Sequence, residues 1–176
     1  MIRNETWLSI GILEYWSIGG IVVLKDQTFG ELYYEYGWNG TAALNWLGET
    51  ENISLAVSGE EEDGISDYQR ESFTAFVNAW PSLQAEVLEQ IYHYYLRLAE
   101  ELGYGDGSHP DYPRLGQVSD INEHIHLDLI SIFEEGIYEG RCVGLAFSCS
   151  WDDENGVGVL LVNEKVEEIG YQDIVF

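Results

Sequence analysis

The stretch SDYQRESFTAFVNAWPSLQAEVLEQIYHYYLRLAEELG, residues 66–103, carries the strongest structural pattern in the chain. Ser66 and Gln69 have capping-box spacing, in which each side chain bonds the backbone N–H of the other residue at a helix start. Pro81 interrupts the pattern, and because proline is tolerated in the first turn of a helix, a second helix is predicted to begin there. Gly103 and Gly105 are the predicted stops. Apolar residues recur at helical spacing in both halves, which predicts a helical pair: Phe73, Phe76, Val77 and Trp80, then Leu83, Val87, Ile91, Tyr94, Tyr95, Leu98 and Leu102.

Both flanks of this stretch are rich in strand-forming residues. Strands are predicted within residues 6–16, 19–24, 30–38, 41–48 and 52–59, and again within 126–136, 140–151, 156–163 and 165–170. In the third of these, Leu32, Tyr34, Tyr36 and Trp38 alternate with polar neighbours, which is typical of a half-buried strand. The order of β-rich, helical and β-rich segments predicts one α+β domain over residues 1–176, with an antiparallel sheet and the helical pair packed on one face.

The charge balance is extreme. The chain has 32 Asp and Glu against 7 Lys and Arg, a formal net charge of −25, and the acids are spread over its whole length. Such a surface repels nucleic-acid phosphates and anionic membranes and attracts cationic partners. We therefore expect neither nucleic-acid nor membrane binding. High solubility alone would also account for this composition.

The compartment is predicted from the termini and the cysteines. The sequence has no run of 18 or more apolar residues, and its first residues do not have the pattern of a signal peptide. Cys142 and Cys149 are seven residues apart, so on one strand they face opposite sides and do not form a disulfide with each other. These features favour a cytoplasmic protein with reduced thiols.

The sequence offers few candidates for catalytic chemistry. His124, His126 and Asp128 alternate, so on a strand all three would project from one face and could hold a metal; two strand histidines with nothing bound is the simpler interpretation. We find no G-x-S-x-G nucleophile motif and no phosphate-binding glycine loop. We therefore expect no enzymatic activity and no cofactor.

Several tyrosines lie beside glycines or acids and are candidates for interface anchors, although each can equally belong to the core: Tyr33, Tyr92, Tyr104, Tyr112 and Tyr171. Residues 103–116 are rich in glycine and proline and predict a loop.

The segment FSCSWDDENGVGVLLVNEKVEEIGYQDI, residues 147–174, resembles a motif in a family of small, acidic bacterial proteins that are similar to the immunity proteins of toxin systems, including contact-dependent growth inhibition. The helical segment 73–98, with its Tyr-Tyr pair, is also similar to that family. Asn155 stands where the family has a histidine, so any role of that histidine does not carry over. The other positions match: Trp151, Asp152, Glu154, Gly156, Gly158, Val159, Lys165, Val166, Gly170 and Asp173.

The resemblance implies an immunity protein that binds and neutralises a cognate basic toxin domain, such as a nuclease, in the cytosol. The acidic composition matches a basic partner, because complementary charge speeds association. Two alternatives remain: a metal-binding protein or enzyme using His124, His126 and Asp128, and an acidic mimic of nucleic acid that inhibits a DNA-binding enzyme. The residues predicted to contact the toxin lie in three acidic segments: Glu60, Glu61, Glu62 and Asp63; Glu134, Glu135 and Glu139; and Asp152, Asp153 and Glu154.

Overall fold

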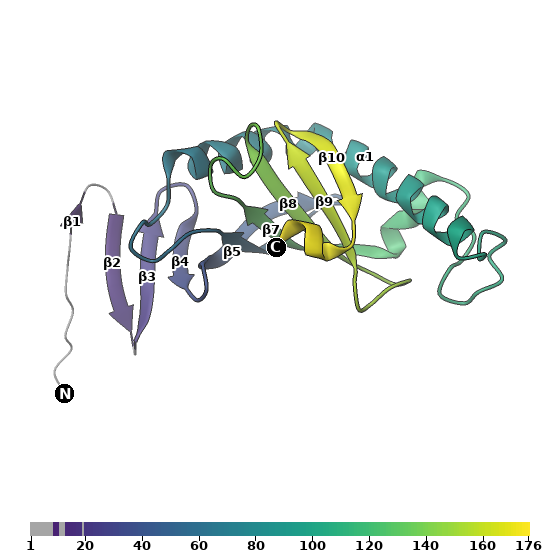
Figure 1. The fold of residues 1–176 in the computed structure, drawn as a ribbon, viewed down its shortest axis with the longest axis horizontal. Helices are drawn as coiled ribbons and strands as arrows, with labels where there is room; N and C mark the ends of the chain where they lie inside the picture. The colour runs from purple at the N-terminus through teal and green to yellow at the C-terminus, as the bar shows by residue number, and fades with distance from the viewer. Residues whose placement is uncertain (1–8, 11–12, 19) are drawn as a thin grey trace.

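The computed structural model describes residues 9–10, 13–18 and 20–176, with side chains described from residue 20 onward (Figure 1). Ten strands form one sheet whose spatial order follows the chain. One long helix, α1 (Asp67–Glu101), and two short 3₁₀ helices complete the described fold. The strands are β1 (Ser9–Ile10), β2 (Leu13–Ile18), β3 (Ile21–Asp26), β4 (Gly30–Tyr34), β5 (Trp38–Trp46), β6 (Glu49–Val57), β7 (Ile125–Ile132), β8 (Cys142–Cys149), β9 (Val157–Val162) and β10 (Lys165–Gly170), and the 3₁₀ helices are η1 (Val118–Glu123) and η2 (Gln172–Val175).

The α+β prediction is confirmed, and the sheet is antiparallel at every described pairing except one. β6 and β7 run parallel, with Ser54 opposite Leu129 and Val57 opposite Ile132. Parallel neighbours need a long crossover connection, and here α1 and the loop after it provide that connection. The strand predicted over residues 6–16 lies partly outside the described residues.

The predicted helical pair is wrong, because α1 continues through Pro81. Its start agrees with the sequence: Ser66 and Gln69 form both bonds of the capping box. On either side of the proline, Trp80 Nε1 and Gln84 Nε2 donate to the carbonyl of Asn45, over 2.7 and 3.1 Å. An interior proline costs about 3 kcal/mol, and we attribute the continuity of α1 to these bonds and to the apolar face that the helix buries on both sides of Pro81.

The sheet has an apolar core on each face. The larger core lies between the sheet and α1, and includes the fully buried rings of Trp38, Phe76 and Phe147. A smaller core on the other face of the C-terminal strands is covered by η2, which lies in front of β9 in Figure 1. Cys142 belongs to the smaller core and Cys149 to the larger one, so the prediction that they face opposite sides is confirmed.

Two hairpin boundaries differ from the sequence prediction. β4 ends at Tyr34, and Tyr36 lies in the turn that follows, with a positive φ of 57° and a fully exposed side chain. The β5–β6 turn is formed by Leu47 and Gly48, both with positive φ, so β6 begins at Glu49 and not at residue 52. Among the described residues, no helix combines the length and the apolar character that a membrane crossing requires.

Candidate partner-binding site

Two of the three acidic segments lie side by side at one end of the sheet. Because β6 and β7 run parallel, the loops that follow them leave the sheet at the same end of the strands. The amide of Ser58 donates to the carbonyl of Ile132 over 2.9 Å, which extends the pairing past the last strand residues. A Cβ placed on Gly59 would lie 3.6 Å from Glu134 Oε1, so the side chain of Glu134 reaches the first loop.

These two loops carry seven exposed carboxylates, which we call the acidic edge: Glu60, Glu61, Glu62, Asp63, Glu134, Glu135 and Glu139. Within the described part of the chain, none of the seven forms an ion pair with a basic side chain. Uncompensated like charges at one edge repel each other and produce a strong local negative potential. The acidic edge can therefore attract a cationic surface without first breaking internal ion pairs.

Tyr34 connects the acidic edge to the neighbouring hairpin. Its hydroxyl donates to Glu60 Oε2 over 3.3 Å. Partial burial of the ring, followed by the charge of Glu60, raises the pKa of Tyr34 above its usual value. The phenol therefore stays protonated and can remain a donor to the first acidic loop.

Exposed apolar side chains lie at the same end of the sheet. The β4–β5 turn is located there because Tyr34 pairs with Trp38, which in turn pairs with Val57 at the end of β6. Tyr36 at its tip is fully exposed, and Ile137 in the second acidic loop is 53% exposed. Tyr36 was predicted to lie in a strand, and Ile137 was not among the predicted contact residues. The glycine that follows Tyr36 was the available signal of a turn.

The third acidic segment lies at the opposite end of the sheet. Val143 of β8 pairs with Ile132, but Cys149 pairs with Ile125, so the turn after β8 lies roughly 25 Å away along the strands. In that turn Asp152 Oδ1 accepts from the backbone N–H of Asn155 over 3.0 Å, which makes Asp152 a turn-forming residue. Asp153 and Glu154 are exposed. The three acidic segments therefore do not form one surface.

The candidate tyrosine anchors divide into two groups. Tyr33 and Tyr171 are 45% and 46% exposed. Tyr92 and Tyr112 are buried in the main core, and Tyr104 packs against it. None of these five lies in the two acidic loops.

The histidine cluster agrees with the prediction in part, because His126 and Asp128 lie on one side of β7 but His124 lies outside the strand. His124 ends η1 and precedes β7, and its Nδ1 lies 2.9 Å from Ser150 Oγ. His126 instead lies between two carboxylates, with Nδ1 3.0 Å from Asp128 Oδ1 and Nε2 2.8 Å from Glu51 Oε2. Both ring nitrogens of His126 therefore face carboxylate oxygens.

A β-bulge lies at Asp128, but His126 and Asp128 still project to the same side of β7, as their spacing predicted. Leu127 pairs with Phe147 but Leu129 pairs with Ala146, so Asp128 is the extra residue of β7. Its Oδ2 accepts from the amide of Ser148 over 2.7 Å. In the described part of the chain, no group of three or more His, Cys, Asp and Glu is arranged to hold a metal ion.

Two carboxylates around one imidazole favour its protonated form. The hydrogen bond to Asp128 raises the pKa of His126 most, the bond to Glu51 adds to this, and partial burial opposes both. The cluster can therefore act as an ion-pair bridge between β6 and β7.

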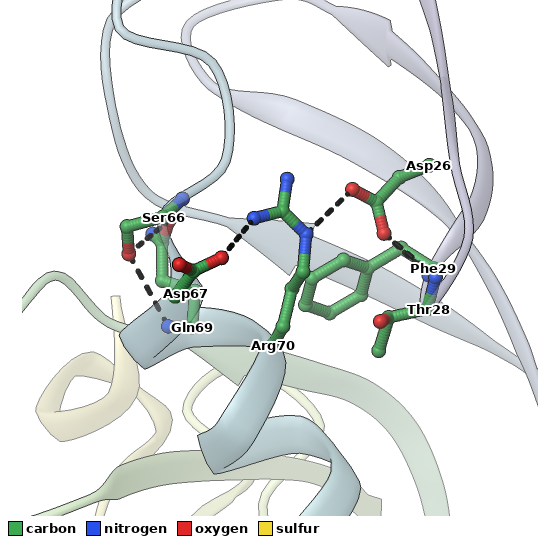
Figure 2. Close-up of polar contacts among 7 residues, drawn as sticks. All are labelled: Asp26, Thr28, Phe29, Ser66, Asp67, Gln69 and Arg70. Carbon is green, nitrogen blue, oxygen red and sulfur yellow. Dashed lines mark hydrogen bonds and ion pairs between the residues drawn. The ribbon is translucent and has the colours of Figure 1, made fainter. Parts of the chain in front are cut away.

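The first turn of α1 is anchored by a buried ion pair. Figure 2 shows Arg70 between two carboxylates: its Nε lies 2.9 Å from Asp26 Oδ2, and its Nη1 lies 2.8 Å from Asp67 Oδ1. Asp26 also accepts from the amides of Thr28 and Phe29, over 2.7 and 3.1 Å. The network fixes the β3–β4 turn to α1, whose start follows directly on the first acidic loop.

A hollow of about 460 Å³ lies beside this network, lined by residues that include Arg70 and Arg141. Arg141 binds Glu164 through two hydrogen bonds of 2.9 and 2.7 Å. Because both guanidinium groups already pair with carboxylates, the hollow has little positive charge left for an anion.

Residues 28–176 match the family described as a domain of unknown function, DUF6985. The chain belongs to this family. No curated protein and no solved structure matches the chain. The DUF6985 match extends from the β3–β4 turn to η2, so it includes both loops of the acidic edge, the histidine cluster and the whole of α1.

Proposed function

We propose that this DUF6985 protein is an immunity protein that binds a cationic toxin domain, of the nuclease class, and neutralises it without catalytic turnover in the cytosol. The observation that carries the proposal is the convergence of two acidic loops at one end of the sheet. The resemblance of residues 147–174 to toxin-immunity proteins supports the same function.

Electrostatics favour a basic partner for this edge. The chain has a formal net charge of −25, and the seven carboxylates of the acidic edge have no basic side chain paired with them in the described structure. Long-range attraction of this kind raises association rates, commonly by about 10 to 10³-fold, and falls steeply with salt. A nuclease has a basic surface because it binds phosphates, so the same surface is attracted to these carboxylates.

Exposed apolar side chains supply the second element of an interface. Charge steers partners together, but most binding energy comes from a few well-packed side chains, with tyrosine among the most frequent. Tyr36 and Ile137 lie exposed at the end of the sheet that carries the acidic edge. We propose that these two side chains are the anchors and that the carboxylates surround them.

The test is a binding measurement with the toxin domain encoded beside this gene. Isothermal titration calorimetry at 50 and 500 mM salt is expected to show a one-to-one complex that weakens at high salt. In a nuclease assay, addition of the protein is expected to abolish cleavage. The absence of a complex at 50 mM salt would refute the proposed function.

A further inference from the structure

A small pocket lies near the end of α1, far from the acidic edge. Its volume is about 160 Å³, close to that of an engineered cavity of about 150 Å³ that binds benzene. α1 rises about 1.5 Å per residue, so roughly 40–50 Å of helix separates the start of α1 from the pocket. It is lined by Tyr95, Leu96, Ala99, Glu100, Tyr104, Gly105, Pro113, Arg114 and Leu115.

The pocket is built by a loop that folds back onto α1. The hydroxyl of Tyr95 donates to the carbonyl of Pro113, and that of Tyr92 donates to the carbonyl of Leu115 over 3.5 Å. The amide of Tyr104 donates to the carbonyl of Ala99 over 2.7 Å. These bonds tie both ends of the loop to the helix, so the pocket has a defined wall on each side.

Six of the nine residues that line the pocket are apolar or aromatic, although its exposed lining also includes polar atoms. Tyr95, Ala99 and Leu115 are buried, with exposed fractions of 2%, 4% and 7%. Tyr104 continues the aromatic wall, with its ring centroid 5.2 Å from that of Tyr112. Flat aromatic rings pack well against such walls, in stacked or edge-on contact.

Two residues of opposite charge, Glu100 and Arg114, are among those that line the pocket. Glu100 and Arg114 are exposed, and within the described residues neither forms an ion pair. Two glycines pack closely against these side chains, and a larger residue at either position would clash. A Cβ on Gly105 would lie 2.3 Å from Glu100 Oε2, and a Cβ on Gly107 would lie 2.8 Å from Arg114 Cβ. A carboxylate and a guanidinium are therefore free to bind complementary groups beside an aromatic pocket.

We propose that this pocket binds a small aromatic zwitterion, with its ring against Tyr95 and Tyr104. The ammonium group of the ligand pairs with Glu100 and its carboxylate pairs with Arg114. A free aromatic amino acid has this chemistry. The site is separate from the acidic edge, so it does not depend on the proposed binding of a toxin.

The test is a titration of the full chain with L-phenylalanine, followed by ¹H–¹⁵N NMR. Shift changes are expected at the amides of Leu96, Gly105 and Leu115. Phenethylamine and 3-phenylpropionate, which each lack one charge, are expected to bind roughly 2- to 5-fold more weakly, as suits exposed ion pairs. N-acetyl-phenylalaninamide tests the other source of an aromatic ring, a residue within a protein. If it binds as tightly as L-phenylalanine, the proposed pairing with Glu100 and Arg114 is wrong.

Substitutions locate the site. Ala99→Leu fills the pocket and is expected to weaken binding at least about 10-fold, the effect of losing about 1.4 kcal/mol, whereas Ala79→Leu, elsewhere on α1, is expected to leave binding unchanged. Glu100→Gln is expected to weaken binding of L-phenylalanine and phenethylamine but not of 3-phenylpropionate, and Arg114→Gln to weaken binding of L-phenylalanine and 3-phenylpropionate but not of phenethylamine. Both side chains are exposed, so these variants keep the fold even if Ala99→Leu does not. Unchanged affinity in both charge variants, or no shift changes at 20 mM L-phenylalanine, would overturn the proposal.

Discussion

Replacing Asp26 with alanine removes the anchor between the β3–β4 turn and the start of α1. The Asp26 side chain is fully buried, and the Arg70 side chain is 17% exposed. The carboxylate accepts three hydrogen bonds, from the amides of Thr28 and Phe29 and from Arg70 Nε. Alanine leaves these donors without their acceptor and leaves the guanidinium with the exposed Asp67 alone.

The expected loss of stability is about 3 kcal/mol. Removal of one partner from a buried ion pair costs about 3–5 kcal/mol, and the remaining contact of Arg70 with Asp67 places Asp26→Ala at the lower end of that range. In a domain of this size, about 1 kcal/mol corresponds to roughly 2–4 °C in Tm, so we expect Tm to fall by roughly 6–12 °C. Asp26→Asn keeps one oxygen acceptor and loses the charge, so its stability is expected to lie between that of the wild type and that of Asp26→Ala.

Urea unfolding followed by tryptophan fluorescence measures this loss. Asp67→Asn is the matched control, because it removes the other carboxylate that pairs with Arg70. The Asp67 side chain is 94% exposed, and exposed ion pairs contribute little to stability. A loss for Asp26→Ala no larger than that for Asp67→Asn would show that Asp26 does not anchor α1.

Three further predictions concern stability and reactivity. Pro81→Ala is expected to stabilise the protein by about 1–2 kcal/mol in urea unfolding, because the helix is already continuous there and alanine restores a backbone donor; a lower unfolding midpoint would contradict this. The hydrogen bond to Asp128 raises the pKa of His126 above the usual 6.5, so the imidazolium contributes stability that is fully present below pH 6.5 and is lost as pH rises through the folded-state pKa. The difference in unfolding free energy between wild type and His126→Gln should therefore be larger at pH 6 than at pH 9, and a difference that does not depend on pH would refute the bridge. Burial raises the pKa of Cys142 to about 12 and of Cys149 to about 11, so a thiol reagent at pH 8 should label neither in the native state and both in urea; rapid native labelling would contradict their burial.

Local signals in the sequence predicted the helix start and the C-terminal strands correctly. The capping box of Ser66 and Gln69 and the opposite faces of Cys142 and Cys149 depend only on spacing along one element. The continuity of α1 through Pro81 could not be predicted in this way, because it depends on bonds to a hairpin that is distant in sequence. In this case tertiary contacts outweigh a local preference.

The candidate site shows the same division. The sequence identified the acidic loops, but the parallel pairing of β6 and β7 decides which of them lie together, and that pairing joins residues about 75 apart in the chain. The spacing of His126 and Asp128 correctly placed both side chains on one side of β7, but it could not show the bulge at Asp128, after which the alternation shifts by one residue. Tyr36 was assigned to a strand because alternation alone does not mark where β4 ends.

We propose that the acidic edge, and not the overall negative charge, binds the basic partner. Two double variants remove two carboxylates each: Glu61→Gln with Glu62→Gln on the acidic edge, and Asp153→Asn with Glu154→Gln at the opposite end of the sheet. The measurement is the association rate constant with the toxin domain at 50 mM salt, by stopped-flow fluorescence. The acidic-edge variant is expected to associate about 10-fold more slowly than wild type, and the other variant within about 2-fold of it. Equal slowing by both variants would show that net charge alone attracts the partner and that the acidic edge is not its binding site.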